Sequence, residues 1–235
     1  MLTVRRASER GHFKNEWLDS HHTFSFGEYH DPQHMGVSVL RVINDDRVIP
    51  GAGFPTHPHN NMEIVSYVLE GELAHKDSMG NGSVIRPGDV QRMSAGTGVT
   101  HSEYNPSDKN VTNFLQIWLL PNKRGVTPGY EQKFFSAKDK QGQFRLLVSP
   151  DGRDDSIPAN SDALLYGAIV DQVDKLNYKI INNRVIYVHV AKGSVIINGE
   201  ALAGGDGITI YEESVVELSG GDEAEVLLFD LPINS

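Results

Sequence analysis

The sequence predicts an all-β protein, on three observations. The most apolar segments are short runs rich in Val, Ile, Leu and aromatic residues, and Gly, Pro, Asn or Asp bounds each of them, as is typical of strands in sandwiches and barrels. No long segment keeps the 3.6-residue apolar period of an amphipathic helix. Two stretches of the chain also repeat a similar order of runs and turns, which favours two β units in tandem.

The individual elements follow from these runs. We expect strands over residues 37–45, 63–71, 113–121, 144–150, 184–193 and 225–232. Short helical turns are expected near 127–135, "TPGYEQKFF". Because all of these elements are short, sheets rather than packed helices should build the core.

The repeat places the expected domain boundary. Residues 67–96 and 188–214 each contain a β-rich run that ends in Gly, a further strand and a Gly-Asp pair, Gly88-Asp89 and Gly205-Asp206. We therefore expect one unit over residues 1–150 and a second over 151–235, joined by the polar stretch 149–162. The alternative is one irregular β domain whose hairpins are alike by chance.

Length and composition describe an ordinary globular chain. The 235 residues can bury a substantial core, and 39% hydrophobic with 22% charged residues argues against disorder. No apolar run approaches the ~20 residues that cross a bilayer. The first twenty residues contain no apolar stretch of the secretory type. We expect a cytoplasmic protein that does not bind membranes.

Cysteine usage and charge exclude several function classes. The chain has no Cys, which excludes disulfides, thiolate nucleophiles, iron–sulfur clusters and thiolate zinc sites. Any metal must be bound by His nitrogens and carboxylate oxygens. The net charge of −10 repels phosphate backbones, and the basic stretch "NKRG" at 122–125 is too short to offset it. We therefore predict no direct nucleic-acid binding.

Two pairs of residues form a candidate metal site. In a strand, residues i and i+2 point to the same face, so His57 and His59 project together, and so do His101 and Glu103. If two neighbouring strands face one barrel interior, the four side chains converge. Three imidazoles and one carboxylate suit Fe(II), Mn(II), Ni(II), Cu(II) or Zn(II), and suit Ca(II) or Mg(II) poorly.

Glu63 leaves three alternatives open. It follows His59 by four residues, so it could replace Glu103 as the carboxylate ligand. It could instead orient a ligand imidazole through a hydrogen bond, as ligating histidines usually require. It could also simply begin the strand at 63–71. For the remaining histidines a structural role is the preferred interpretation: His21, His22, His30, His34, His75 and His189.

These residues resemble the cupin motifs. The first motif is matched by Gly51, His57, His59, Glu63 and Gly71, although the family pattern has one residue fewer before the last Gly. The end of the second motif is matched by Gly98, His101 and Asn105, with Gly96 where the family has Pro. The longer stretches 20–46, 54–81 and 93–106 resemble the pirin family, and in particular its bacterial pirin-like quercetin 2,3-dioxygenases.

The resemblance implies a bicupin, two cupin β-barrels in tandem with metal only in the N-terminal barrel. It carries the metal ligands onto His57, His59, His101 and Glu103, which favours Glu103 over Glu63 as the fourth ligand. The corresponding segments of the second half, 179–190 and 211–220, contain neither His-x-His nor His-x-Glu, in agreement with a second barrel without metal.

The resemblance also implies an activity. It is that of a metal-dependent dioxygenase that opens the heterocyclic ring of flavonols such as quercetin with O2 and releases CO. Glu103 is the expected catalytic base and Glu63 the reserve. We expect one divalent metal, Fe(II) before Cu, Ni, Mn, Co or Zn, a small flavonol-like substrate, and a monomer. The alternatives are an iron-dependent transcription cofactor, which the acidic charge disfavours, and a dioxygenase for another enol or catechol.

Overall fold

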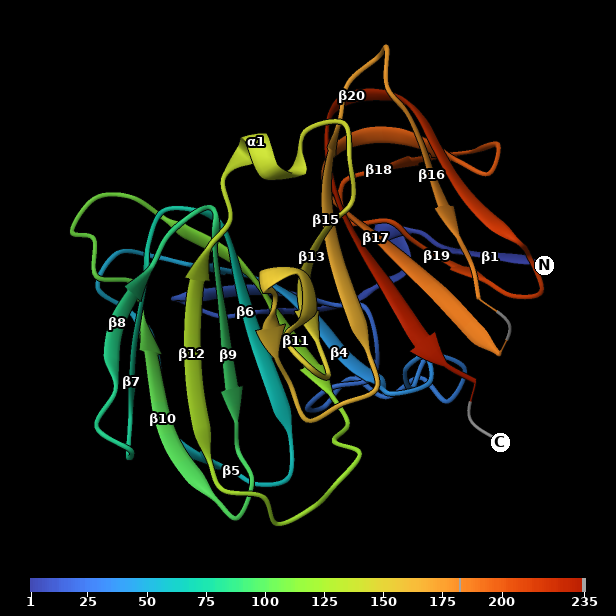
Figure 1. Ribbon diagram of the computed structural model, residues 1–235. Helices are drawn as coiled ribbons and strands as arrows, with labels where there is room; N and C mark the ends of the chain where they lie inside the picture. The colour runs from blue at the N-terminus through green and yellow to red at the C-terminus, as the bar shows by residue number, and fades with distance from the viewer. Residues whose placement is uncertain (182, 234–235) are drawn as a thin grey trace.

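The chain forms two β-barrels that lie side by side. The computed structural model describes residues 1–181 and 183–233, and Figure 1 shows the teal and green strands of the first barrel beside the orange and red strands of the second. The all-β prediction is confirmed. The described helices are three short pieces: η1 (Ala7–Glu9), α1 (Ala137–Lys140) and η2 (Arg153–Asp155). None of the described helices is long and apolar enough to span a membrane.

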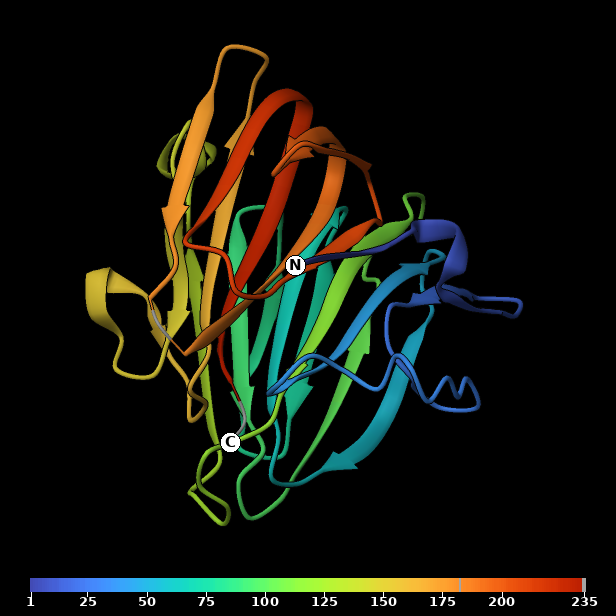
Figure 2. The same ribbon diagram turned by 90° about the vertical axis from the view of Figure 1, so that its right-hand side faces the viewer.

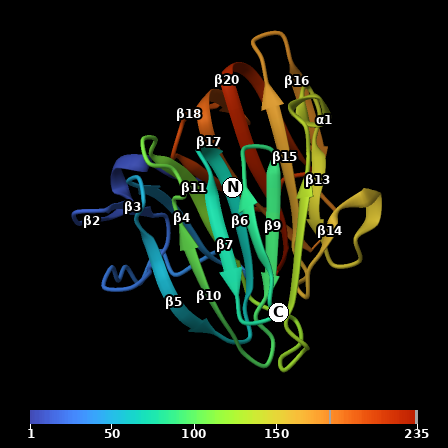
Figure 3. The ribbon, with the colours of Figure 1, turned by 90° about the vertical axis from the view of Figure 1, so that its left-hand side faces the viewer.

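The first barrel consists of two sheets that face each other (Figure 3). One sheet has four strands in the order β5 (Gly53–His59), β10 (Val99–Tyr104), β7 (Leu73–Asp77) and β8 (Gly82–Ile85). The other has seven strands in the order β12 (Gly129–Phe134), β9 (Asp89–Ser94), β6 (Glu63–Glu70), β11 (Thr112–Leu119), β4 (Leu40–Val48), β3 (Leu18–His22) and β2 (Gly11–Lys14).

The second barrel is one nine-stranded sheet that curls on itself. Its main path is β1 (Leu2–Arg5), β19 (Gly207–Ile210), β17 (Arg184–Ile197), β20 (Val215–Pro232), β15 (Leu164–Val170), β13 (Arg145–Ser149) and β14 (Ile157–Pro158). Off this path, β16 (Lys175–Lys179) pairs with β20, and β18 (Glu200–Ala203) pairs with β17. The long strands β17 and β20 pair through several β-bulges, which bend the sheet.

Strand existence follows the sequence closely, with one exception. Each of the six predicted runs overlaps a strand, namely β4, β6, β11, β13, β17 and β20. The helical turns expected at 127–135 are wrong, because residues 129–134 form β12 and pair antiparallel with β9 from Gly129↔Ser94 to Phe134↔Asp89. A free sheet edge that offers backbone hydrogen bonds overrides a weak local preference.

Two strands cross the expected boundary between the units. The division at residue 150 stays a prediction, but β1 pairs with β19 and β13 pairs with β15, so both belong to the C-terminal sheet. Figure 2 shows the N-terminus beside the orange and red strands, and the blue segment after it passes on to the first barrel. The N-terminal segment thus connects the two barrels.

The apolar side chains form a core between the barrels and a core inside the second. The first cluster combines Tyr67 and Leu115 of one barrel with Tyr187, Leu227 and Phe229 of the other. The second cluster fills the C-terminal barrel with the aliphatic side chains of β17, β19 and β20. Because neighbouring residues of a strand point to opposite faces, strands β9, β6, β11 and β4 of the seven-stranded sheet each direct one face to the shared core and the other inward.

The inward face of the first barrel carries a row of polar side chains. Strand register sets Gln91 of β9 opposite Ser66, Ser66 opposite Gln116, Gln116 opposite Asn44, and Asn44 opposite His22. All five are buried. A barrel interior that is polar across five adjacent strands is suited to binding a polar group or an ion, since buried polar atoms need partners.

Candidate metal centre

Strands β5 and β10 bring three histidines together. They pair antiparallel with His57 opposite His101 and His59 opposite Val99, so both members of the His-x-His pair point inward next to His101. One ring nitrogen of each histidine lies within 4.8 Å of the others. The Nε2 atoms of His57 and His101 are 3.1 Å apart, close to the spacing of two adjacent nitrogens that each lie about 2.1 Å from one ion.

The orientation of His57 leaves its metal-side nitrogen free. Its Nδ1 lies 2.8 Å from the carbonyl oxygen of Pro55, so Nδ1–H donates and the Nε2 lone pair faces the other histidines. Fixing one ring nitrogen by a backbone hydrogen bond is a usual way to select the tautomer that binds a metal.

Burial keeps two of the histidines neutral. Desolvation is the main cause that lowers the pKa of His59 to about 4, and the nearby His57 contributes to the same shift. Desolvation is the main cause that lowers the pKa of His101 to about 3. The neighbouring imidazoles of His57, His59 and His75 contribute to the same shift. Neutral imidazole is the form that binds a metal, so the trio fits a divalent transition-metal ion in both its donors and its spacing.

Glu103 lies beside the trio and is held from the opposite sheet. A β-bulge after His101 sets Glu103 opposite Phe54 on β5. Its Oε2 accepts a hydrogen bond from Gln116 Nε2 at 2.6 Å, and its Oε1 accepts one from Ser66 Oγ at 3.1 Å. Burial raises the pKa of Glu103 to about 7. A cation next to the carboxylate would favour its ionised form.

His75 is one of the histidines for which the sequence favours a structural role. In the structure its side chain is buried on β7, directly opposite Glu103. His75 forms a second group with His101 and Glu103 in which donor atoms lie within 4.8 Å of one another, and its Nε2 lies 3.3 Å from Asp77 Oδ2. The alternation "HKD" at 75–77 was the available signal, but the neighbouring strand was not known.

Glu63 is turned away from the histidines. It is the first residue of β6, as one of the three alternatives expected, and it is buried. Its Oε2 accepts a hydrogen bond from Ser94 Oγ at 2.6 Å. Glu63 is on the face of β6 opposite Ser66 and is not among the described residues that line the cavity below. The structure therefore does not bring Glu63 to the site as reserve base or ligand.

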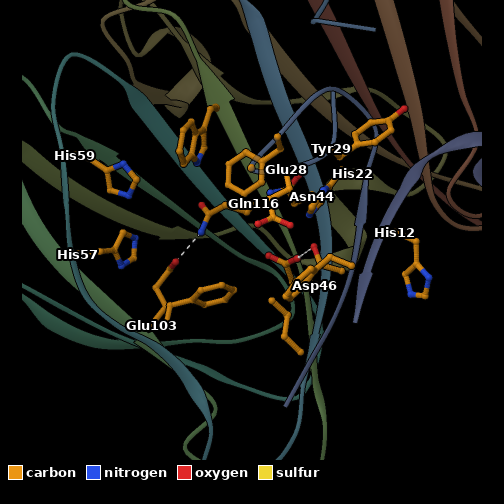
Figure 4. Close-up of a pocket in the computed structure, with 17 residues that line it drawn as sticks. His12, His22, Glu28, Tyr29, Asn44, Asp46, His57, His59, Glu103 and Gln116 are labelled. Atoms are coloured by element: carbon orange, nitrogen blue, oxygen red, sulfur yellow. Dashed lines mark hydrogen bonds between the residues drawn. The ribbon is translucent and has the colours of Figure 1, made fainter. Parts of the chain in front are cut away.

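A cavity of about 560 Å³ opens next to the trio. His57, His59 and Glu103 line one part of it, and the rest is lined by aromatic and polar side chains (Figure 4). The aromatic ones include Phe26, Phe54 and Trp118, and the indole of Trp118 meets both His59 and Phe26 edge-on, with ring centroids 5.0 and 5.3 Å apart. The volume is in the range of small-molecule sites.

Several polar residues of this cavity were absent from the sequence-based site. They are His22, Asn44, Asp46 and Gln116. Gln116 interrupts the apolar run of β11, and Asn44 and Asp46 are alternate polar residues of β4 that share its inward face, so this alternation was a readable signal. His22, expected to be structural, reaches the cavity because β3 pairs with β4.

A further histidine cluster lies at the outer edge of the cavity. His12, Asp19 and His21 have donor atoms within 4.8 Å of one another. Lys14 Nζ occupies one carboxylate oxygen of Asp19 at 2.7 Å, and the two imidazole rings stack almost parallel, at 13°. Lys14 already compensates the charge of the Asp19 carboxylate, so the trio of His57, His59 and His101 is the better metal site.

The fold and the site define a two-barrel cupin protein with a His/Glu metal-site candidate in the first barrel. Residues 3–119 match the pirin family, and residues 146–231 match the quercetinase C-terminal cupin domain. The chain belongs to the pirin family. It is 47% identical to the quercetin 2,3-dioxygenase of Escherichia coli K12 over 99% of both chains, and 40% identical to a pirin-like protein of Caulobacter vibrioides over 98% of this chain and 99% of that one.

Solved structures agree with this placement. The protein YhhW of Escherichia coli superposes with a TM-score of 0.95 at 46% identity, over 99% of this chain and 98% of that chain. A second structure, bacterial pirin YhhW in complex with nickel(II), superposes with a TM-score of 0.94, over 99% of each chain. A quercetin 2,3-dioxygenase of Acinetobacter baumannii, 21% identical with a TM-score of 0.73, covers 99% of this chain and 87% of that chain and shares the fold. The predicted bicupin fold is confirmed.

Proposed function

We propose that this protein is a metal-dependent dioxygenase that opens the heterocyclic ring of flavonols such as quercetin. The observation that carries the proposal is the trio of His57, His59 and His101, with Glu103 beside it, at one end of an aromatic-walled cavity of about 560 Å³. The names of the full-length relatives, quercetin 2,3-dioxygenase, support the choice of substrate.

His57, His59, His101 and Glu103 would hold one divalent transition metal. When bound, such an ion supplies Lewis acidity that favours the ionised form of a flavonol 3-oxygen. Fe(II) remains our expectation among the metals that a His/Glu set accepts. The structure of the relative with nickel(II) supports a divalent metal of this class, and Cu, Mn, Co and Zn stay alternatives because availability often decides between them.

Glu103 would accept the proton of the flavonol 3-hydroxyl. Its carboxylate lines the cavity next to the trio, while Gln116 and Ser66 hold it through one hydrogen bond to each oxygen. A base held in this way needs little rearrangement before it takes a proton. Phe26, Phe54 and Trp118 exclude water from the remaining surface of a planar substrate.

The overall reaction balances with O2 as the oxidant. Both oxygen atoms of O2 enter the organic product, one at C2 and one at C4 of the heterocycle. The C2–C3 and C3–C4 bonds break, C3 leaves with its oxygen as CO, and the product is a depside. The 3-hydroxyl proton passes to Glu103 and from there to the product carboxylate.

Metal analysis and turnover test the proposal together. Purified protein is expected to bind one metal per chain and to bleach the quercetin absorption band in air with release of CO. His57→Ala should lose metal and reduce turnover to background. His30→Ala, a change at an exposed histidine outside the cavity, should keep both and serves as the matched control.

Two outcomes would contradict the proposal in different ways. Stoichiometric metal without turnover of quercetin would remove the flavonol assignment and leave the site. A panel of other enols and catechols, and a binding assay for transcription factors, would then separate the two alternative functions. Absence of metal after anaerobic loading with iron would remove the site itself.

A further inference from the structure

The cavity has a second polar end, away from the trio. Figure 4 shows His57, His59 and Glu103 on one side, His22, Asn44 and Asp46 on the other, and Gln116 between them. The far group comes from β3 and β4, which pair with each other and lie beside β11 in the sheet. The six residues and Gln116 all line the same cavity.

The far end presents polar atoms that the protein itself does not satisfy. Asn44 Oδ1 and His22 Nδ1 are buried without a hydrogen-bond partner among the described residues. Their residues are 3% and 6% exposed, and Asp46 is 3% exposed. The Asp46 carboxylate accepts a hydrogen bond from Ser20 through Oδ1, which leaves its second oxygen without a bond to a described residue. Buried polar atoms without partners are rare in folded proteins, and in the wall of a cavity they can bond to a ligand or to water.

The separation of the two ends suits a ligand of several rings. Gln116, which donates to Glu103, is directly opposite Asn44, and Asn44 is directly opposite His22. Neighbouring strands lie about 4.8 Å apart, so His22 is roughly 10 Å from Gln116 across the sheet. A planar molecule of two fused rings and a third linked ring can span this gap between Phe26, Phe54 and Trp118.

We propose that His22, Asn44 and Asp46 form a subsite that selects polyphenols bearing a hydroxyl group at the end remote from the metal-binding oxygens. The subsite would accept the hydrogen bond of that hydroxyl and orient the substrate along the cavity. The proposal rests on the proposed function for the identity of the metal-bound end, and it names what that function leaves open, the hydroxylation pattern of the substrate.

The side chains at the far end of the cavity favour a ligand group that donates a hydrogen bond over an anionic group. Asp46 and Asn44 Oδ1 can accept hydrogen bonds, and no described Lys or Arg lines the cavity, so the lining offers no positive charge to an anionic ligand group. Burial raises the pKa of Asp46 to about 7, so near neutral pH this carboxyl group can also share a proton with a phenol. A site built from unsatisfied acceptors rejects an analogue that lacks the donor, because the acceptors then stay buried without partners.

A series of flavonols tests the subsite by binding alone. 3-Hydroxyflavone, galangin, kaempferol and quercetin share the chelating 3-hydroxyl and 4-carbonyl groups and gain ring hydroxyls in that order. Titration calorimetry of the metal-loaded protein under nitrogen gives Kd without turnover. We expect Kd to fall by about tenfold or more at one step of the series, and that step shows which ring reaches the subsite.

Substitutions at Asp46 decide whether the subsite causes this step. Asp46→Leu should remove it and change the Kd of 3-hydroxyflavone by less than about threefold. Asp46→Asn keeps the volume and an acceptor for Ser20, should fold in any case, and should reduce the step. Asp45→Asn is the matched control, since Asp45 is the next residue of β4, pairs with Arg10 and Asn113 and does not line the cavity. It should keep the step.

The outcomes separate this inference from the proposed function. Equal Kd values along the series in the wild-type protein, or an unchanged step in both Asp46 variants, would overturn the subsite even if quercetin is turned over in air. A step that disappears in Asp46→Leu would support the subsite even if no flavonol is turned over, in which case only the dioxygenase assignment would fail.

Discussion

At the centre of the first barrel, strand register sets Ser66, Gln116 and Asn44 side by side on β6, β11 and β4. In the nine-stranded sheet of the second barrel, register sets Val188, Leu228 and Tyr166 side by side on β17, β20 and β15, which are the third to fifth strands of its main path, as β6, β11 and β4 are in the seven-stranded sheet. In the first row, Ser66 and Gln116 donate hydrogen bonds to Glu103. The second belongs to a packed apolar cluster.

This difference shows that the first barrel has less stabilising apolar burial at the place where its site lies. An apolar row contributes about 25 cal/mol for each Å² that it removes from water. A polar row must find partners instead, and an unpartnered buried polar atom costs roughly 1–3 kcal/mol. Gln91, in the polar row, has both amide atoms buried without partners among the described residues. The second barrel thus stabilises the chain, while the first keeps room for chemistry.

A polar substitution in the apolar row of the second barrel should have the largest effect on stability. Leu228→Gln places an amide at the position that corresponds to Gln116, in a side chain that is fully buried among aliphatic neighbours. We expect the free energy of unfolding to fall by about 3–5 kcal/mol, because the amide is buried without partners and the aliphatic packing is lost. Urea unfolding followed by circular dichroism measures the change.

Leu228→Met is the control for this substitution. It keeps the volume and the apolar character of the side chain, so it should cost less than about 1.5 kcal/mol. A loss below about 1 kcal/mol in Leu228→Gln would show that the second barrel accommodates polar groups as readily as the first, and the contrast between the barrels would not hold.

The second largest effect should be a pH dependence of stability that comes from Asp46 in the first barrel. Burial raises the pKa of Asp46 in the folded state from the ordinary 3.8 to about 7. The hydrogen bond from Ser20 opposes part of this shift. Between about pH 4 and 7 the folded state therefore holds a proton that the unfolded state releases. Stability from this group is complete below pH 4 and is lost as the pH rises through 7, by about 4 kcal/mol in total.

Comparison of metal-free wild type with Asp46→Asn isolates this contribution. His22, with a pKa lowered to about 4 by burial, contributes in the opposite direction, but it does so in both proteins. We expect the unfolding free energy of the wild type to decline relative to that of Asp46→Asn between pH 4.5 and 7.5. Parallel curves would show that Asp46 is ionised in the folded state across this range.

Making the first barrel resemble the second should cost activity rather than stability. Gln116→Leu removes the donor that lies 2.6 Å from Glu103 Oε2. Loss of a residue that holds a metal ligand typically reduces metal affinity or activity by about 10–100-fold, which competition with a chelator and flavonol turnover measure. Gln132→Leu, at the β12 end of the same face, does not contact Glu103 and should stay within about threefold of wild type. Equal effects of both changes would contradict a specific role for Gln116.

The metal-site candidate was readable from the sequence because it depends on local rules. Alternation along a strand places His57 with His59 and His101 with Glu103, and this needs no knowledge of the fold. Only the pairing of β5 with β10 had to be assumed, and the structure contains it. The residues that came from further away were not readable, since no local pattern states that β7 lies beside β10 or β3 beside β4. His75 and His22 reach the site through those pairings.

Misreadings had the same physical origin. The segment 127–135 has little intrinsic preference, and the free edge of β9 decides that it becomes a strand. The start of the chain shows no local sign that β1 joins the sheet of the second barrel. Sequence patterns thus predict the face of a strand well, while the partner of a strand is fixed by long-range packing that a single sequence does not display.

Glu63 provides the smallest expected effect and the sharpest test of which face of β6 belongs to the site. In the sequence it stands four residues after His59, but in the structure it lies on the opposite face from Ser66 and accepts a hydrogen bond from Ser94. Glu63→Gln keeps an acceptor for Ser94, so metal content should be unchanged and kcat/KM for quercetin should stay within about twofold of wild type. Glu103→Gln should reduce the same quantity by about 100-fold or more. A tenfold loss in Glu63→Gln with full metal content would mean that a proton path crosses β6, and the shared core between the barrels would then take part in catalysis.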